Sequence, residues 1–315
     1  MLYDNLSVND RGHLLLAGYD TAELAEEYGT PLLLLDEQTV RARCQLYREA
    51  MAAAFPGGSL PLYASKALSC KALYKIAMEE KLGADVASPG ELYTARKAGF
   101  PMEKAFFHGS NKSDADIRMG MENGIGVFIC DGADELRAVS REAVRQGIRQ
   151  KVLLRVTPGV DPHTHEKINT GRVDSKFGTA IETGQAALAS GLALELPGLE
   201  LLGFHCHIGS QIFSSRPLCD AVELMTDFIA EIRTQYGFAA KVLDLGGGMA
   251  VRYTAEEPTV DYAATIREIG RTLCEACRSL DLPVPFVLME PGRSLVADSG
   301  VTLYTVGSVK SIPGF

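Results

Sequence analysis

The chain has 315 residues, of which 46% are hydrophobic, and a formal net charge of −9, so it can form one large domain or two ordinary ones. The acidic balance argues against nucleic acid or an anionic membrane as partner, because both favour a basic surface. No apolar run reaches the ~18 residues of a membrane span, and the stretch MLYDNLSVND lacks the basic-then-apolar order of a signal peptide. Seven irregularly spaced cysteines indicate reduced thiols and a cytoplasmic protein.

The chain alternates between apolar runs and helical patterns. Residues 12–18 resemble a strand with no helix after it. Eight apolar runs that suit buried parallel strands follow, in this order: PLYASKA, GADVAS, AFFHGS, GVFIC, VLLRVT, LLGFHCHIGS, KVLDLGGG and PFVLMEPG. Helices are predicted near residues 38–54, 88–99, 113–124, 131–147, 214–235 and 262–280. Ser88 with Glu91, Ser113 and Asp131 are the expected N-terminal caps.

Eight strand–helix units predict a (β/α)8 TIM barrel, because a doubly wound open sheet rarely has eight parallel strands. Residues 12–18 and 300–310 do not fit the barrel, and we interpret them as a partial second β domain formed from both termini. The predicted divisions are an N-terminal segment of that β domain at 1–30, the barrel at 31–292, and the start of the C-terminal β domain at 293–315. The β pattern stops at IPGF, so we expect the chain to be C-terminally incomplete.

Polar residues follow nearly every predicted strand, at the rim where barrels carry their active sites. The candidates at these strand ends are Lys66, Asp85, His108, Arg155, His205, His207, Ser210, Gly246, Gly247, Gly248, Glu290, Pro291, Gly292 and Arg293. A buried lysine is costly unless it is paired, neutralised or used covalently. Desolvation would lower the pKa of Lys66, so that its amine could attack a carbonyl group.

The triple glycine Gly246–Gly248 could bind a phosphate through its backbone amides, with a hydroxyl from Ser210. The alternative is a flexible turn, although barrels often bind phosphate after strands seven and eight. Glu290 ends an apolar strand and needs a cationic partner, either Arg293 or a protonated ring nitrogen of a ligand.

The histidines His205 and His207 lie two apart, so they are expected to face the same way on a strand. One interpretation is a metal pair completed by His163 and His165, as in metal-dependent hydrolases; another is that one ring stacks on a planar ligand and the other supports it. A third is two buried histidines without a functional role. A lone CxxC at Cys274 and Cys277 lies in a helical pattern, and without a second pair it does not predict zinc.

A reactive lysine, a phosphate site, a stacking histidine and a buried carboxylate together match the needs of pyridoxal 5'-phosphate. The sequence also resembles the diaminopimelate decarboxylases, which have the alanine-racemase-like fold. The motifs that carry this resemblance are YASKA, GADVASPGEL, HGSNKS, THEKINTGRVDSKFG, GFHCHIGSQI, LDLGGG and EPGRSLVA, and they cover nearly the whole chain.

The resemblance implies a role for each candidate residue. Lys66 would bind the cofactor covalently, His207 would stack on its ring, and Glu290 would pair with its pyridine nitrogen. Ser210, Gly246, Gly247, Gly248 and the segment Glu290, Pro291, Gly292 and Arg293 would hold the phosphate, and Arg293 could instead contact a substrate carboxylate. Asp85 and Arg155 would support the lysine and the ring hydroxyl.

The implied reaction converts meso-2,6-diaminopimelate to L-lysine and carbon dioxide in a homodimer with active sites at the interface, without a metal. The alternatives are decarboxylation of ornithine, arginine or carboxynorspermidine, or a non-catalytic regulatory relative that binds the cofactor. The family's β domain continues past residue 315 and carries a cysteine that none of the seven here matches. We therefore expect weak or absent activity from residues 1–315 alone.

Overall fold

Eight parallel strands close into a barrel in the computed structural model, which describes residues 1–161 and 176–314. β13 pairs with β5, and β8 pairs with β9, which completes the ring. The strands are β5 (Ser59–Ala64), β6 (Gly83–Val86), β7 (Ala105–Phe107), β8 (Val127–Cys130), β9 (Gln150–Thr157), β11 (Leu199–His205), β12 (Val242–Asp244) and β13 (Phe286–Met289). The predicted TIM barrel and all eight predicted strands are confirmed, and a short β10 (Thr179–Ala180) pairs with β9.

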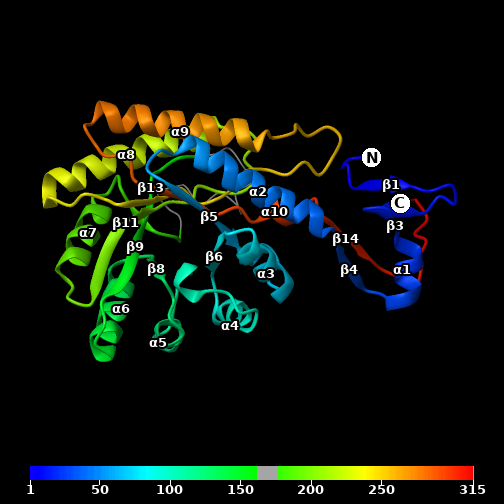
Figure 1. Cartoon of the computed structure of the whole chain (residues 1–315), viewed down its shortest axis with the longest axis horizontal. Coiled ribbons are helices and arrows are strands. Elements are labelled where there is room, and N and C mark those ends of the chain that lie inside the picture. The colour runs from blue at the N-terminus through cyan, green and yellow to red at the C-terminus, as the bar shows by residue number, and fades with distance from the viewer. Residues whose placement is uncertain (162–175, 315) are drawn as a thin grey trace.

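Helices surround the outer face of this barrel (Figure 1). They are α2 (Glu37–Ala54), α3 (Lys71–Glu79), α4 (Pro89–Lys97), α5 (Asp114–Glu122), α6 (Ala133–Gln146), α7 (Gln185–Glu195), α8 (Arg216–Tyr236) and α9 (Tyr262–Ser279). Short 3-10 turns η1 (Ser65–Ala67) and η2 (Met102–Lys104) follow β5 and precede β7. Among the described residues, none of these helices has the length and apolar character that crossing a membrane requires.

Two of the three predicted caps are confirmed. The Ser88 hydroxyl accepts a hydrogen bond from the amide of Glu91, and Ser113 forms a complete capping box with Asp116. The Glu91 carboxylate does not close a box on Ser88; it accepts hydrogen bonds from the amide of Ala87 and the hydroxyl of Ser65. It therefore ties the start of α4 to the turn that carries the candidate lysine.

The predicted cap at Asp131 was wrong. Helix α6 begins one residue later than expected, with Gly132 as N-cap and no side-chain capping hydrogen bond. The Asp131 amide donates to the carboxylate of Glu135 in the first turn of the helix. The side chain of Asp131 is therefore left to face the barrel rim, where its Oδ1 lies 3.8 Å from Nε of Arg155.

The barrel interior has an apolar floor and a polar upper layer. The floor consists of Leu62, Phe106, Val127, Ile129, Leu153 and Leu288. Because side chains alternate across a strand, the residue two positions further on faces the same interior. His108, Arg155 and Glu290 occupy those next positions, after Phe106, Leu153 and Leu288. The strand period therefore places titratable groups directly above the apolar floor.

Two small antiparallel sheets lie beside the barrel, at the same end of the molecule as both termini (Figure 1). One contains β1 (Leu6–Val8), β2 (Leu14–Leu16) and β3 (Tyr19–Asp20), followed by α1 (Thr21–Tyr28), a helix that the sequence analysis did not predict. In the other, β4 (Leu32–Leu35) pairs with β14 (Gly300–Leu303), so only the first part of the expected strand at 300–310 forms. Since β4 lies outside the barrel, the first barrel strand is β5; the domain limits at 30 and 292 stay a prediction.

Candidate active site

A cavity of about 630 Å³ opens between the carboxyl ends of the barrel strands and the β4–β14 sheet. Its far wall includes Leu33, Leu35 and Val301 of that sheet. Of the candidates from the sequence, Lys66, His207, Ser210, Gly248, Glu290, Gly292 and Arg293 line it. These seven residues line a single cavity, although they come from four different strand ends and from the helix α10 (Arg293–Val296). A closed barrel is expected to gather strand ends in this way.

Lys66 lies on η1, immediately after β5, and its Nζ is 2.7 Å from Oδ2 of the fully buried Asp85 on β6. The lysine side chain is 47% exposed because it borders the open cavity. Desolvation lowers its pKa, but the charges of Asp85 and Glu290 outweigh that effect and raise the pKa of Lys66 to about 12. The expectation of a lowered pKa was therefore wrong, because it omitted the carboxylate beside the amine.

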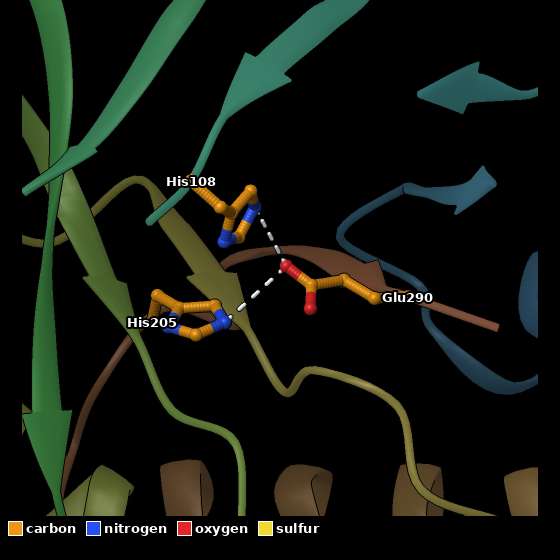
Figure 2. Close-up of side chains that lie close together, drawn as sticks. All are labelled: His108, His205 and Glu290. Atoms are coloured by element: carbon orange, nitrogen blue, oxygen red, sulfur yellow. Dashed lines mark ion pairs between the residues drawn. The ribbon is translucent and has the colours of Figure 1, made fainter. Parts of the chain in front are cut away.

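Glu290, just beyond β13, meets two histidines inside the barrel, as Figure 2 shows. Its Oε1 lies 2.9 Å from Nε2 of His108 and 3.2 Å from Nε2 of His205, and all three side chains are buried. The imidazole rings pack edge to face at 5.1 Å. Neither nitrogen is aligned for a hydrogen bond with Oε1. Burial alone would raise the pKa of Glu290, but the two imidazoles hold it well below its usual range.

Arg293 was one of the two expected partners of Glu290, and the structure pairs it with other residues. Its guanidinium donates to the hydroxyl of Ser210 at 3.1 Å and to that of Tyr253 at 2.8 Å. Tyr253, a cavity-lining residue, was missed by the sequence analysis because it lies in an irregular segment after strand β12. The arginine therefore joins two loops of the cavity wall, and Glu290 contacts His108 and His205 instead.

Asp244 at the end of β12 was also missed, although its sequence position, at the end of a buried strand, resembles that of Glu290. It is fully buried, and its Oδ1 accepts a hydrogen bond from the amide of Gly246. Burial, and then the neighbouring charge of Glu290, raise the pKa of Asp244 well above its usual range. The buried carboxyls of Asp244 and Glu290 therefore have pKa values shifted in opposite directions.

The three glycines after β12 have different surroundings. The amide of Gly246 is bonded to Asp244, and that of Gly247 donates to Nδ1 of His207 at 3.2 Å. Of the three, the described cavity lining includes Gly248 alone. A Cβ on Gly248 would lie 2.4 Å from the carbonyl oxygen of Gly209, and the residue has φ +121°, so only glycine fits.

The other candidates lie around the cavity rather than in its lining. Arg155 is buried and its guanidinium packs 4.5 Å from the ring centre of Phe177. The Pro291 carbonyl accepts a hydrogen bond from the amide of Ala64, which joins β13 to the turn that carries the lysine. These residues orient the walls of the site.

The histidines His205 and His207 do not share one environment. Strand β11 ends at His205, which lies in the barrel interior, whereas His207 lines the cavity. Because the Gly247 amide donates to Nδ1 of His207, the neutral ring carries its proton on Nε2; burial, and then the charge of Lys66, lower the pKa of His207 well below its usual range.

The metal interpretations can be compared with the described residues. His108, His205 and Glu290, and not the HxH pair, form a trio whose ligand atoms lie within 4.8 Å of one another. His163 and His165, with most of the run THEKINTGRVDSKFG, lie outside the described residues. Cys274 and Cys277 both lie on α9 as free thiols.

Comparison with known proteins connects this geometry with a family. Residues 37–297 match the family model described as "Pyridoxal-dependent decarboxylase, pyridoxal binding domain". Diaminopimelate decarboxylases of Halalkalibacterium halodurans and Bacillus subtilis are 44% and 43% identical over 97% of this chain and 70% of their own length. A crystal structure of diaminopimelate decarboxylase from M. jannaschii in complex with L-lysine superposes with a TM-score of 0.86 at 33% identity, covering 98% of this chain and 71% of that one. The chain belongs to the diaminopimelate decarboxylase family of pyridoxal-dependent decarboxylases.

Proposed function

We propose that this chain uses pyridoxal 5'-phosphate to remove one carboxylate from meso-2,6-diaminopimelate, giving L-lysine and carbon dioxide. The observation that carries the proposal is the convergence on one cavity of an amine on Lys66, a buried anion on Glu290 and a glycine-lined wall at Gly248 and Gly292. The family supplies the substrate, and the cavity supplies groups of the kinds that the cofactor requires.

The cavity walls fit the cofactor part by part. Gly248 and Gly292 line one wall, and neither has room for a side chain: a Cβ would lie 2.4 Å from the carbonyl oxygen of Gly209 at the first and 3.0 Å from the Ala64 side chain at the second. The hydroxyl of Ser210 and the cationic side chain of Arg293 border the same wall. We assign the phosphate to this wall, and we assign Gly246 and Gly247 to holding Asp244 and His207 in place.

The remaining assignments follow from position. The Lys66 amine borders the cavity and would bind the aldehyde, with Asp85 orienting the amine. His207, held through its Nδ1 by Gly247, would stack on the cofactor ring. Glu290 would pair with the pyridine nitrogen, and Arg155 would support the side of the ring hydroxyl. Bound pyridoxal phosphate supplies an aldehyde for the substrate amine and a ring that accepts the electron pair left when carbon dioxide departs.

The chain's own residues hold this chemistry in place. An ionised Glu290 favours a proton on a ring nitrogen beside it, which strengthens the ring as an electron acceptor. Leu33 and Leu35 of β4 and Val301 of β14 give the cavity an apolar wall, and apolar surroundings strengthen the electrostatic interactions beside them. Arg293 is also placed to meet a substrate carboxylate, since its guanidinium lies at the cavity wall.

The test begins with the visible absorbance of the purified protein after loading with pyridoxal phosphate. We expect a band of lysine-bound cofactor that borohydride traps on Lys66, that is lost in Lys66→Ala, and that is retained in Lys71→Ala, an exposed lysine on α3. Chromatography should then detect lysine from meso-diaminopimelate. No trapped adduct in a cofactor-loaded sample would refute the proposal.

Substrate competition separates the alternatives. Preferential release of carbon dioxide from ornithine, arginine or carboxynorspermidine would assign the chain to another branch of basic amino-acid decarboxylases. A lysine-bound cofactor without carbon dioxide from any of these substrates would identify a non-catalytic relative.

We further infer that the chain acts as a homodimer in the cytoplasm, with its active sites at the interface. The family resemblance supports the dimer, and light scattering should then give twice the chain mass of 33.9 kDa. The free state of all seven cysteines supports a reducing compartment. A monomer at micromolar concentration in the presence of cofactor would contradict the dimer.

A further inference from the structure

We propose that His108 and His205 are positioning residues that hold Glu290 ionised as the anionic partner of the cofactor's pyridine nitrogen. The inference rests on the proposed function and concerns side chains that do not line the cavity themselves. It adds a layer beneath the cofactor site, contributed by β7 and β11, two strands that are not neighbours of β13 in the barrel.

The contact geometry carries the first step. Oε1 of Glu290 lies within 3.2 Å of one nitrogen from each ring, and the rings pack edge to face at an interplanar angle of 73°. Within the described chain, Nε2 of His108 and both ring nitrogens of His205 are buried without a hydrogen-bond partner. Buried polar atoms without partners are rare and costly, and two of these nitrogens face a single oxygen. A small rotation of either ring would complete a hydrogen bond to it.

The charge balance carries the second step. The titratable and charged groups that surround this oxygen come from seven strand ends, and they are Lys66, Asp85, His108, Arg155, His205, His207, Asp244 and Glu290. Two cationic side chains, Lys66 and Arg155, oppose the carboxylates of Asp85 and Glu290, and burial raises the pKa of Asp244 well above its usual range. Burial lowers the pKa of His205 to about 4, so this ring is neutral at physiological pH.

A neutral imidazole stabilises the carboxylate through the N–H dipole and leaves its charge available for another cation. This is the property that an anionic partner of a pyridinium needs. A divalent metal ion bound by the same trio would add two positive charges beside those of Lys66 and Arg155 and would occupy the carboxylate. The arrangement therefore fits a supporting role for the histidines better than metal ligation.

The competing explanation is that the two rings only fill the barrel interior above its apolar floor. Phe106, two residues before His108 on β7, belongs to that floor and fills space without polar atoms. It offers a matched control: Phe106→Leu changes packing in the same strand but leaves the surroundings of Glu290 polar.

The experiment uses the cofactor-loaded protein and pyridoxal phosphate labelled with nitrogen-15 in the ring. The variants are His205→Leu, His205→Gln, His108→Leu, His108→Gln and Phe106→Leu. We measure the ring-nitrogen chemical shift, which reports its protonation, and the dissociation constant of the cofactor. Each leucine variant should move the shift toward the unprotonated value and weaken cofactor binding about tenfold, the loss expected for one hydrogen bond to a charged group. The glutamine variants, which keep an N–H donor, should restore most of both.

The outcomes separate the two proposals. Wild-type chemical shifts in both leucine variants would overturn the inference, as would equal losses in the leucine, glutamine and Phe106→Leu variants, because that pattern reports packing alone. If a leucine variant does not fold, the glutamine variant at that position is compared with Phe106→Leu. A chemical shift and cofactor affinity closer to wild type in the glutamine variant would support the inference, and equal losses in the two would overturn it. Failure of the wild-type protein to bind the cofactor at Lys66 would instead refute the proposed function and, with it, the inference.

Discussion

Replacement of Asp85 by asparagine should accelerate covalent capture of the cofactor by the cofactor-free protein. Only the neutral amine of Lys66 can attack an aldehyde, and its pKa is raised to about 12 by a carboxylate 2.7 Å away and by Glu290, against the opposing effect of desolvation. Asp85→Asn keeps the shape of the side chain and removes the charge. The pKa of Lys66 should therefore fall, and the neutral fraction should rise.

The structure sets the size of this effect. At pH 8 a pKa of about 12 leaves about one amine in ten thousand neutral. A return to the ordinary value of 10.5 would raise that fraction roughly thirtyfold. Because the lysine side chain is 47% exposed, water screens part of the ion pair, and Glu290 still attracts the ammonium. We therefore expect an acceleration of about tenfold.

Stopped-flow absorbance of the cofactor-free protein mixed with pyridoxal phosphate measures this rate. The wild-type rate should increase about tenfold per pH unit between about pH 7 and 10, since each unit increases the neutral amine tenfold. Asp131→Asn, which removes another carboxylate of the same rim, is the control and should behave like wild type. A rate independent of pH, or an Asp85→Asn variant no faster than wild type, would refute the reasoning.

Two further changes test the wall of the site and the barrel frame. Gly248→Ala would place a methyl group 2.4 Å from a backbone oxygen at φ +121°; we expect a loss of about 2 kcal/mol in urea unfolding and weaker cofactor binding, whereas Gly132→Ala, with open space around its Cβ, should change neither. In the structure the carboxylate of Glu135 lies 2.5 Å from the buried ammonium of Lys112. Lys112→Met would leave this buried carboxylate without its cationic partner. This should cost about 3–5 kcal/mol of unfolding free energy, and adding Glu135→Leu should recover most of it; no recovery would show that the backbone carbonyls bound by Lys112 dominate.

The barrel was predictable because its signals are local. Each apolar run is bounded by a cap or a glycine, as at Ser88 and Ser113, and those short-range interactions survive in the structure. The β4–β14 pair was not predictable in the same way: Leu32–Leu35 has the composition of a buried strand, yet its partner lies at Gly300–Leu303. The outcome depends on a contact between distant segments, which local composition does not encode.

The site shows the same division. The strand-end positions of Lys66 and Glu290 follow from the sequence, whereas their electrostatic partners follow from barrel closure. A lysine at the end of an apolar run has a lowered pKa if burial dominates and a raised one if a carboxylate lies beside it, and the sign depends on the 2.7 Å contact with Asp85. Likewise, Glu290 is more than 80 residues from His205 and more than 180 from His108 along the chain.

The neutral ring of His205 beneath a carboxylate connects the fold to the chemistry. Were His205 protonated, its charge would cancel that of Glu290 before a ligand arrived, and a protonated pyridine nitrogen would lose its partner. Complete burial prevents this, because desolvation lowers the pKa of His205 to about 4 in spite of the adjacent carboxylate. Burial at that depth requires β7, β11 and β13 to enclose a single volume. The closed barrel thus does more than present strand ends at one rim: it keeps the negative charge of Glu290 available for the cofactor at every pH at which His205 stays neutral.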